Sequence, residues 1–335
     1  MCDDRRRAAA RRGVTVRGWS TTGGLLLVLV SVGCGDPQAP AATITAAFER
    51  DQLLADVRVL SADDMEGRLV ASPGGAKARA YILERFAAAG LEPIDGTFEF
   101  PFAIDAAADG TLRRGVNVVG RIPGTRGAAR AIVVTAHYDH IGVRNGEVYN
   151  GADDNASGTA ALLAIAQHFR AHQPAHTFVL AALDAEEGGL RGARAFVASP
   201  PVPREAIVLN INLDMIGRDP DDILYAAGPS HYPFLVPYIE RVAADAPIKL
   251  VMGHDAPGRA GMDDWTSSSD HFPFHEAGIP FIYFGVEDFP HHHKPTDDYE
   301  TLTHDFYVRA VTTIIEALRV FDADLEAIDR ARQAR

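Results

Sequence analysis

Short apolar runs alternate with stretches of helical periodicity from residue 97 to the C-terminus, and this alternation limits the fold more than any other feature. The runs are rich in Val, Ile, Leu and Ala throughout, as in strands covered on two sides. The predicted strands are 97–102, 116–122, 131–136, 177–183, 206–213, 223–226, 249–252 and 280–284. The predicted helices are 43–60, 75–89, 157–171, 190–197, 232–244 and 304–323. This order predicts an α/β fold: a single globular domain with a mixed, mostly parallel β-sheet flanked by helices on both faces.

Residues 1–33 differ in composition from the rest of the chain. Six arginines precede an apolar run at 25–30, which is too short to span a bilayer as a helix. A basic segment followed by a short apolar one is typical of a signal peptide, so we expect residues 1–33 to be removed on export.

Cys34 follows this leader in a context similar to the lipidation site of bacterial lipoproteins. We therefore expect a lipidated Cys34, a flexible tether over residues 34–44, and membrane attachment through the lipid. The protein would be a periplasmic, outer-membrane or cell-surface lipoprotein of a bacterium; ordinary cleavage near Cys34, giving a secreted protein, is the alternative. Cys2 lies in the leader, so a metal site in the domain at 45–335 must use His, Asp and Glu.

The chain is acidic, with a formal net charge of −13, and removal of the arginine-rich leader makes it more so. A surface of this sign repels a phosphate backbone, which argues against nucleic acid as a partner. Hydrophobic residues make up 47% of the 335 residues, enough for one large core.

Polar clusters follow several of the predicted strands. Residues 137–140 read HYDH, 184–187 read DAEE, Asp214 follows the strand at 206–213, and 291–298 read HHHKPTDD. Ligands of open α/β sheets bind beyond the carboxyl ends of the strands, so these clusters should converge. Each cluster alone has an ordinary explanation, such as a core histidine or a solvated pair of glutamates. Their joint occurrence predicts imidazoles and carboxylates around two cations, with a base beside them.

The segment 151–158, GADDNASG, opens the helix predicted at 157–171. A helix N-cap explains one of its polar residues but not two adjacent aspartates. One of the aspartates is therefore a candidate ligand for a cation.

Several motifs resemble those of the zinc-dependent aminopeptidases of family M28, and they occur in that family's order. They are AHYDH, GADDNASG, LDAEEGGLRGA, NLDMIG, SSDHFPF and HKPTDD, between residues 136 and 298. The resemblance extends from about residue 45 to the C-terminus, and the interval 96–131 is too short for a protease-associated insert. It implies a metal-dependent exopeptidase with two Zn²⁺ ions per chain, which removes N-terminal amino acids from peptides with a free N-terminus.

The resemblance also implies roles for individual residues. Asp154 would bridge the two ions, and a cis peptide bond often follows this aspartate in the family. Glu186 would be the general base, and Asp139 would orient the ring of a liganding histidine. The metal ligands would be His137, Asp154, Glu187, Asp214 and His293, with His292 as the alternative to His293.

Other residues of the motifs would serve the site indirectly. Asp153 would be structural, and either Ser157 or Asn155 would cap the helix. His271 either lines the pocket, where it contacts the substrate, or packs in the interior.

Three other functions remain open. A glutaminyl cyclase shares the fold and part of the motif set but uses one zinc ion, whereas GGLRGA after the glutamate pair follows the aminopeptidase pattern. A carboxypeptidase would need a cation to bind the substrate's carboxylate. Arg191 is a candidate, but its Leu-Arg-Gly sequence suggests a structural role. A non-catalytic binding lipoprotein would be expected to have lost ligands or the base, and none is missing.

Overall fold

The computed structural model describes residues 48–106, 112–256, 263–288 and 290–334. The predicted signal peptide, Cys34 and the tether lie outside the described residues. Within the described ranges, no helix is both long enough and apolar enough to cross a membrane.

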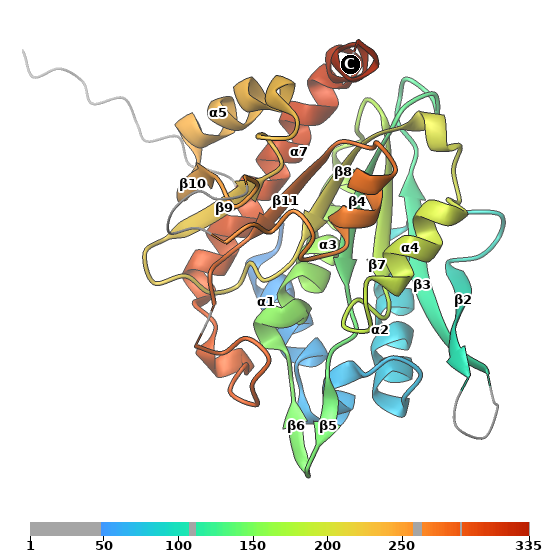
Figure 1. The fold of residues 1–335 in the computed structure, drawn as a ribbon, viewed down its shortest axis with the longest axis vertical. Helices are drawn as coiled ribbons and strands as arrows, with labels where there is room; N and C mark the ends of the chain where they lie inside the picture. Colours follow the sequence, from blue (N-terminus) through green and yellow to red (C-terminus); the bar gives the residue numbers. More distant parts are fainter. Residues whose placement is uncertain (1–47, 107–111, 257–262, 289, 335) are drawn as a thin grey trace, which may run out of the picture. The chain divides into compact units, whose positions relative to one another are not determined.

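One mixed sheet of nine strands runs through the described domain (Figure 1). Its strands are β1 (Glu92–Pro93), β2 (Glu99–Ala106), β3 (Leu112–Ile122), β4 (Ala131–His137), β7 (Thr177–Leu183), β8 (Ile207–Leu213), β9 (Ile223–Ala227), β10 (Lys249–Met252) and β11 (Phe281–Gly285). They lie in the order β1-β3-β7-β4-β8-β11-β9-β10, with β2 paired to β3. The central strands β7, β4, β8 and β11 are parallel, and antiparallel pairs flank them. Their carboxyl ends therefore share one edge of the sheet.

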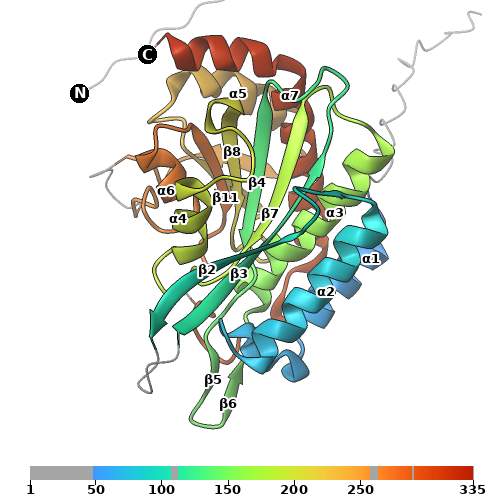
Figure 2. The same ribbon diagram turned by 90° about the vertical axis from the view of Figure 1, so that its right-hand side faces the viewer.

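Helices cover both faces of this sheet (Figure 2). One face is covered by α1 (Arg50–Leu60), α2 (Pro73–Ala89), α3 (Gly158–Ala171), α5 (Val236–Asp245) and α7 (His304–Gln333), which share a large hydrophobic core. The other face is covered by α4 (Arg191–Ala198) and α6 (His271–Glu276), which pack in a smaller core. The predicted α/β fold, with a mixed sheet between two helical layers, is confirmed.

Local sequence signals explain both boundaries of helix α2. Helix α2 begins where the Ser72 hydroxyl accepts a hydrogen bond from the N–H of Gly75, and it ends at Gly90, whose φ of 73° continues no helix. Between them, Ala78, Ile82 and Phe86 recur at helical spacing and are fully buried. Helix α1 begins at Arg50, because Glu49 before it has extended backbone angles, and residues 43–47 of the predicted helix lie outside the described residues.

Helix α7 is longer than predicted and continues to Gln333 rather than ending at 323. Leu325 and Ile328 keep the apolar spacing of the helix and are fully buried in the core. The charged residues beside them, Asp324, Glu326 and Asp329, hide this spacing in the sequence.

A hairpin of β5 (Gly142–Arg144) and β6 (Glu147–Tyr149) was not predicted. Its turn residues, Asn145 and Gly146, have φ values of 55° and 83°. Asn-Gly with two positive φ angles is the commonest signal of a tight hairpin turn, so the sequence did contain the evidence.

Arg68 ties the N-terminal helices to the loops at the sheet edge. Its side chain is buried, and burial lowers the pKa of the guanidinium to about 10. It donates hydrogen bonds to the carbonyl oxygens of Tyr138 (2.8 Å), Leu60 (2.6 Å), Asn150 (2.5 Å) and Gly151 (2.8 Å). One guanidinium thus holds the loop after β4, the segment before α3 and the end of α1 together.

Candidate metal centre

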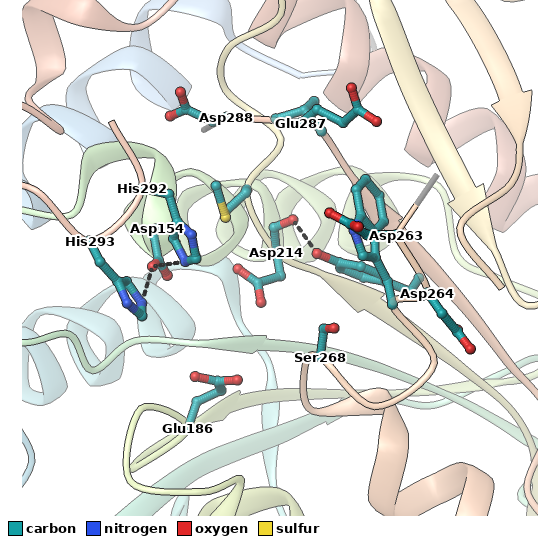
Figure 3. A pocket seen from close by; sticks show the side chains of 14 residues that line it. Asp154, Glu186, Asp214, Asp263, Asp264, Ser268, Glu287, Asp288, His292 and His293 are labelled. Carbon is teal, nitrogen blue, oxygen red and sulfur yellow. Dashed lines mark hydrogen bonds and ion pairs between the residues drawn. The ribbon is translucent and has the colours of Figure 1, made fainter. Parts of the chain in front are cut away.

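The polar clusters predicted to converge do so, around a cavity of about 350 Å³ at the carboxyl edge of the sheet. Its lining includes Asp154, Glu186, Asp214, Trp265, His292 and His293. Figure 3 shows Glu186 pointing into the cavity, toward Asp154 and Asp214. Glu186 and Asp214 lie just beyond β7 and β8, Asp154 lies in the turn that leads into α3, and His292 and His293 lie in the segment between β11 and α7.

The first donor group lies at the ends of β4 and β8. The Nε2 atom of His137 is 3.2 Å from Oδ1 of Asp214 and 3.4 Å from Oδ1 of Asp154. The Ser269 hydroxyl donates to Oδ2 of Asp214 at 2.6 Å, which leaves Oδ1 directed at the histidine. All three members are buried.

The second donor group uses the other oxygen of the same aspartate. Oδ2 of Asp154 lies 3.2 Å from Nε2 of His293, and that nitrogen lies 3.1 Å from Oε2 of Glu187. The Nε2 atom of His292 is farther from Asp154, at 3.6 Å. His293 therefore contacts two carboxylates where His292 approaches one, which favours His293 over its alternative.

Asp154 is held between the two groups by a short π-helical turn, Ala152–Ser157. The carboxylate of Asp297 accepts the backbone N–H groups of Asp153 (2.9 Å) and Asp154 (3.0 Å). The peptide bond from Asp154 to Asn155 is cis, as the resemblance implied.

The neighbours of Asp154 have structural contacts. Oδ1 of Asp153 accepts the N–H of Gly217 at 2.6 Å. Oδ1 of Asn155 accepts the N–H of Gly158 at 2.9 Å, so Asn155, and not Ser157, supplies the side-chain cap of α3. This turn therefore explains both aspartates: one carboxylate braces the loop and the other faces the cavity.

The pKa values of the carboxyl groups divide into two classes. Burial alone would raise the pKa of Asp154, but His140, His137 and His293 hold it well below its usual value. The pKa of Glu187 falls to about 2 in spite of its burial and of nearby Asp154, because of the imidazoles beside it. Burial raises the pKa of Glu186 well above its usual value, and neighbouring carboxylates add to the effect. Adjacent glutamates with opposite shifts are typical of an ionised ligand beside a proton acceptor.

Asp139 contacts His137 in two ways. Nδ1 of the ring lies 3.1 Å from the backbone oxygen of Asp139 and 3.7 Å from its carboxylate Oδ1. The hydrogen bond that fixes the ring therefore goes to the carbonyl, and the carboxylate lies just behind it.

His271 does not line the cavity. It is fully buried, its Nε2 donates to the carbonyl oxygen of Trp265 at 2.9 Å, and its ring stacks on Tyr283 with centroids 4.7 Å apart. Of the two roles predicted for His271, the structure supports packing behind the cavity wall.

His140 is the residue at this site that the sequence analysis did not select. It is fully buried, and its Nδ1 atom lies 2.6 Å from Oε1 of Glu187. The signal was the second histidine of HYDH, three residues beyond the end of β4, where either histidine could turn inward.

The donor set fits a pair of zinc ions. Among the described residues, imidazole nitrogens and carboxylate oxygens gather in three groups whose atoms lie within 4.8 Å of one another: His137, Glu186 and Asp214; Asp154, His292 and His293; and His140, Asp154 and Glu187. Zinc prefers these ligands when thiolates are absent. Oδ1 of Asp154 faces His137 and its Oδ2 faces His293, so this carboxylate is shared between the two sides, as a bridging ligand must be.

The strand order and this donor set define an α/β protein with a two-part metal-binding edge of the metallohydrolase type. The sequence profile of peptidase family M28 matches residues 117–318, and the chain belongs to this family.

Relatives found by sequence agree with the family. The chain is 26% identical over 290 residues to a probable zinc metalloprotease of Leptosphaeria maculans, with 77% of this chain and 61% of that protein covered. It is 31% identical over 185 residues to aminopeptidase YwaD of Bacillus subtilis, with 51% and 37% covered. The chain thus spans 61% and 37% of the length of these two relatives, less than two thirds of each.

Solved structures show the same fold. A leucine aminopeptidase precursor from Bacteroides thetaiotaomicron superposes with a TM-score of 0.64 at 21% identity, covering 81% of this chain and 97% of that one. A glutaminyl cyclase from Porphyromonas gingivalis superposes with a TM-score of 0.66 at 19% identity, covering 82% and 98%. The fold therefore does not separate these two activities.

Proposed function

We propose that this protein is a zinc-dependent exopeptidase that removes N-terminal amino acids from peptides. The observation that carries the proposal is the position of Asp154, whose two oxygens face two separate donor groups, with Glu186 beside them in the same cavity. A bridging carboxylate next to a base of raised pKa is the arrangement that two-metal hydrolysis requires.

The metal-binding residues and the general base can be assigned from their positions in the site. His137, Asp154 and Asp214 would hold one zinc ion, and Asp154, Glu187 and His293 the other. When bound, the two ions polarise the scissile carbonyl and attract the α-amino group of the substrate. Glu186 takes a proton from the attacking water and passes it to the leaving amine, for which its raised pKa is suited.

The charge of the cavity favours an aminopeptidase over a carboxypeptidase. Among the described residues that line it, there is no Lys or Arg to pair with a substrate carboxylate, whereas Asp263, Asp264 and Glu287 add negative charge beyond the donor groups. Arg191 lies elsewhere: its Nε donates to the carbonyl of Gly188 at the start of α4. An amine is therefore the end of a peptide that this cavity attracts.

The glutaminyl cyclase remains the second candidate, because such enzymes share the fold. Two donor groups joined by Asp154 favour two ions, whereas the cyclase uses one. We also propose export through residues 1–33, with attachment to a membrane at Cys34.

The test uses purified residues 35–335 with measured zinc content. Release of free amino acids is followed from unblocked and N-acetylated peptides, with and without chelator, and cyclisation of N-terminal glutamine is assayed in parallel. We expect two zinc ions per chain and chelator-sensitive cleavage of unblocked peptides only. One zinc ion with cyclisation would assign the protein to the cyclases instead, and full zinc content with neither activity would leave a binding protein.

A further inference from the structure

His140 lies on the side of Asp154 that faces Glu187. Its Nδ1 atom is 2.6 Å from Oε1 of Glu187 and 3.7 Å from Oδ2 of Asp154. The three side chains form a group whose donor atoms lie within 4.8 Å of one another. His293 approaches the same two carboxylates, and the centroids of the two imidazoles are 6.0 Å apart at an interplanar angle of 59°. Two rings thus point at one position from different directions.

The contact between Nδ1 of His140 and Oε1 of Glu187 is an ion pair that does not have the geometry of a hydrogen bond. Within the described residues, neither ring nitrogen of His140 has a hydrogen-bond partner, and Oε1 of Glu187 has none either. Buried polar atoms are almost always satisfied, and an ion is one of the standard reasons for an exception. The group offers one imidazole nitrogen and two carboxylate oxygens, which are ligand types that zinc takes when thiolates are absent.

The backbone is shaped to admit this ring. Gly151 has a φ of 55°, and a Cβ atom there would lie 2.5 Å from Cδ2 of His140. Arg68 holds the carbonyls of Tyr138 and Gly151, on the two segments that enclose the ring. The inward position of His140 is therefore built by three separate parts of the chain.

We propose that His140 is a ligand of the zinc ion on the Glu187 side, in addition to Asp154, Glu187 and His293. This inference rests on the proposed function. It makes the two positions unequal, because the Glu187 side has two imidazoles and the His137 side has one. Imidazole is a strong ligand for zinc, so the Glu187 side binds zinc more tightly and fills first.

The experiment is a titration of the metal-free protein with Zn²⁺ against a chromophoric chelator, which gives both dissociation constants without reference to activity. The variant is His140→Gln. The matched control is His176→Gln, which replaces another buried histidine, hydrogen-bonded to Asp322 and outside the site. His140→Ala is prepared as well, and circular dichroism establishes which variants fold.

We expect two constants for the wild type and the control. His140→Gln should weaken the tighter site by about 100-fold or more and leave the other unchanged, since even residues that only orient a ligand contribute about 10- to 100-fold. With Co²⁺ in place of zinc, the visible absorption of the first equivalent should change in the variant only. Unchanged constants in a folded His140 variant would overturn this inference while leaving the proposed function intact. A wild type that binds no zinc would overturn both.

Discussion

The backbone N–H of Glu186 donates a hydrogen bond to Oδ1 of Asp139 at 2.9 Å. The same carboxylate lies 3.7 Å from Nδ1 of His137, so one buried side chain positions both a candidate ligand and the proposed base. Its other oxygen has no hydrogen-bond partner among the described residues. Asp139 therefore links two strand ends across the site.

Replacing Asp139 tests this link. Asp139→Ala removes the acceptor for the N–H of Glu186 and the charge beside His137, and we expect kcat/KM to fall about 10- to 100-fold. Asp139→Asn keeps an oxygen for the N–H and should lose less. Asp245→Ala, at an exposed position, is the control. Equal kcat/KM in Asp139→Ala, Asp139→Asn and the control would show that the contacts of Asp139 with Glu186 and His137 do not contribute to activity.

The proposed base is tested by Glu186→Gln. Because the amide cannot accept the proton, we expect kcat to fall by about two to four orders of magnitude with two zinc ions retained. Glu147→Gln, on the exposed strand β6, should behave as wild type. If kcat of Glu186→Gln, measured at full zinc content, equals that of the wild type, Glu186 is not the general base.

Chelation should destabilise the fold. Asp154, Glu187 and Asp214 are largely buried close together, so cations that bind only the folded state stabilise it by mass action. At zinc concentrations about 100-fold above the dissociation constant, the gain is about 2.7 kcal/mol, or roughly 4–5 °C in Tm for a domain of this size. Thermal unfolding followed by circular dichroism, with zinc and with chelator, measures it. Identical Tm values would argue against tight zinc binding.

Arg68 should be essential for stability. Arg68→Ala would leave four carbonyl groups without their buried donor, and we expect a loss of about 3–5 kcal/mol in the free energy of unfolding. Arg68→Lys cannot reproduce the fork of donors and should also be destabilised. Urea unfolding measures both, with the exposed Arg330→Ala as control. If the free energy of unfolding of Arg68→Ala falls by less than about 1 kcal/mol, the cost of an ordinary hydrogen bond, the four hydrogen bonds of Arg68 are not needed for stability.

His271 gives the stability a pH dependence. Burial lowers its pKa to about 3, against about 6.5 for an unfolded histidine, so between these values the unfolded chain binds the additional proton. Its contribution is complete above pH 6.5 and is lost as the pH falls, by about 1.4 kcal/mol between pH 7.5 and 5.5. His271→Gln should reduce this slope by that amount in urea unfolding of the metal-free protein, whereas the exposed His172→Gln should not. Parallel slopes for wild type and His271→Gln would contradict the assignment.

Much of the site could be predicted because its residues directly follow strands. His137 ends β4 and Asp214 follows β8, so their convergence depends only on parallel pairing, which the apolar runs indicate. His140 could not be selected in the same way. Its direction depends on the path of a loop that Arg68 and Gly151 fix from distant parts of the sequence.

The choice between neighbouring histidines also needed the structure. His292 and His293 have the same chemistry and differ in the distance from Nε2 to Asp154, 3.6 Å against 3.2 Å, and in the contact of His293 with Glu187. The packing of His271 depends on contacts with Trp265 and Tyr283, which no local pattern reveals.

The hydrogen bonds of Arg68 to the loop after β4 and to the segment before α3 set a lower limit on the size of a fragment that can be studied in isolation. The family match begins at residue 117, and a fragment cut there would lack Arg68 together with α1 and α2. It would also uncover the apolar side of α3, which those helices pack against. Boundaries drawn from sequence matching alone would therefore yield an insoluble or misfolded product, and expression trials should begin upstream of α1.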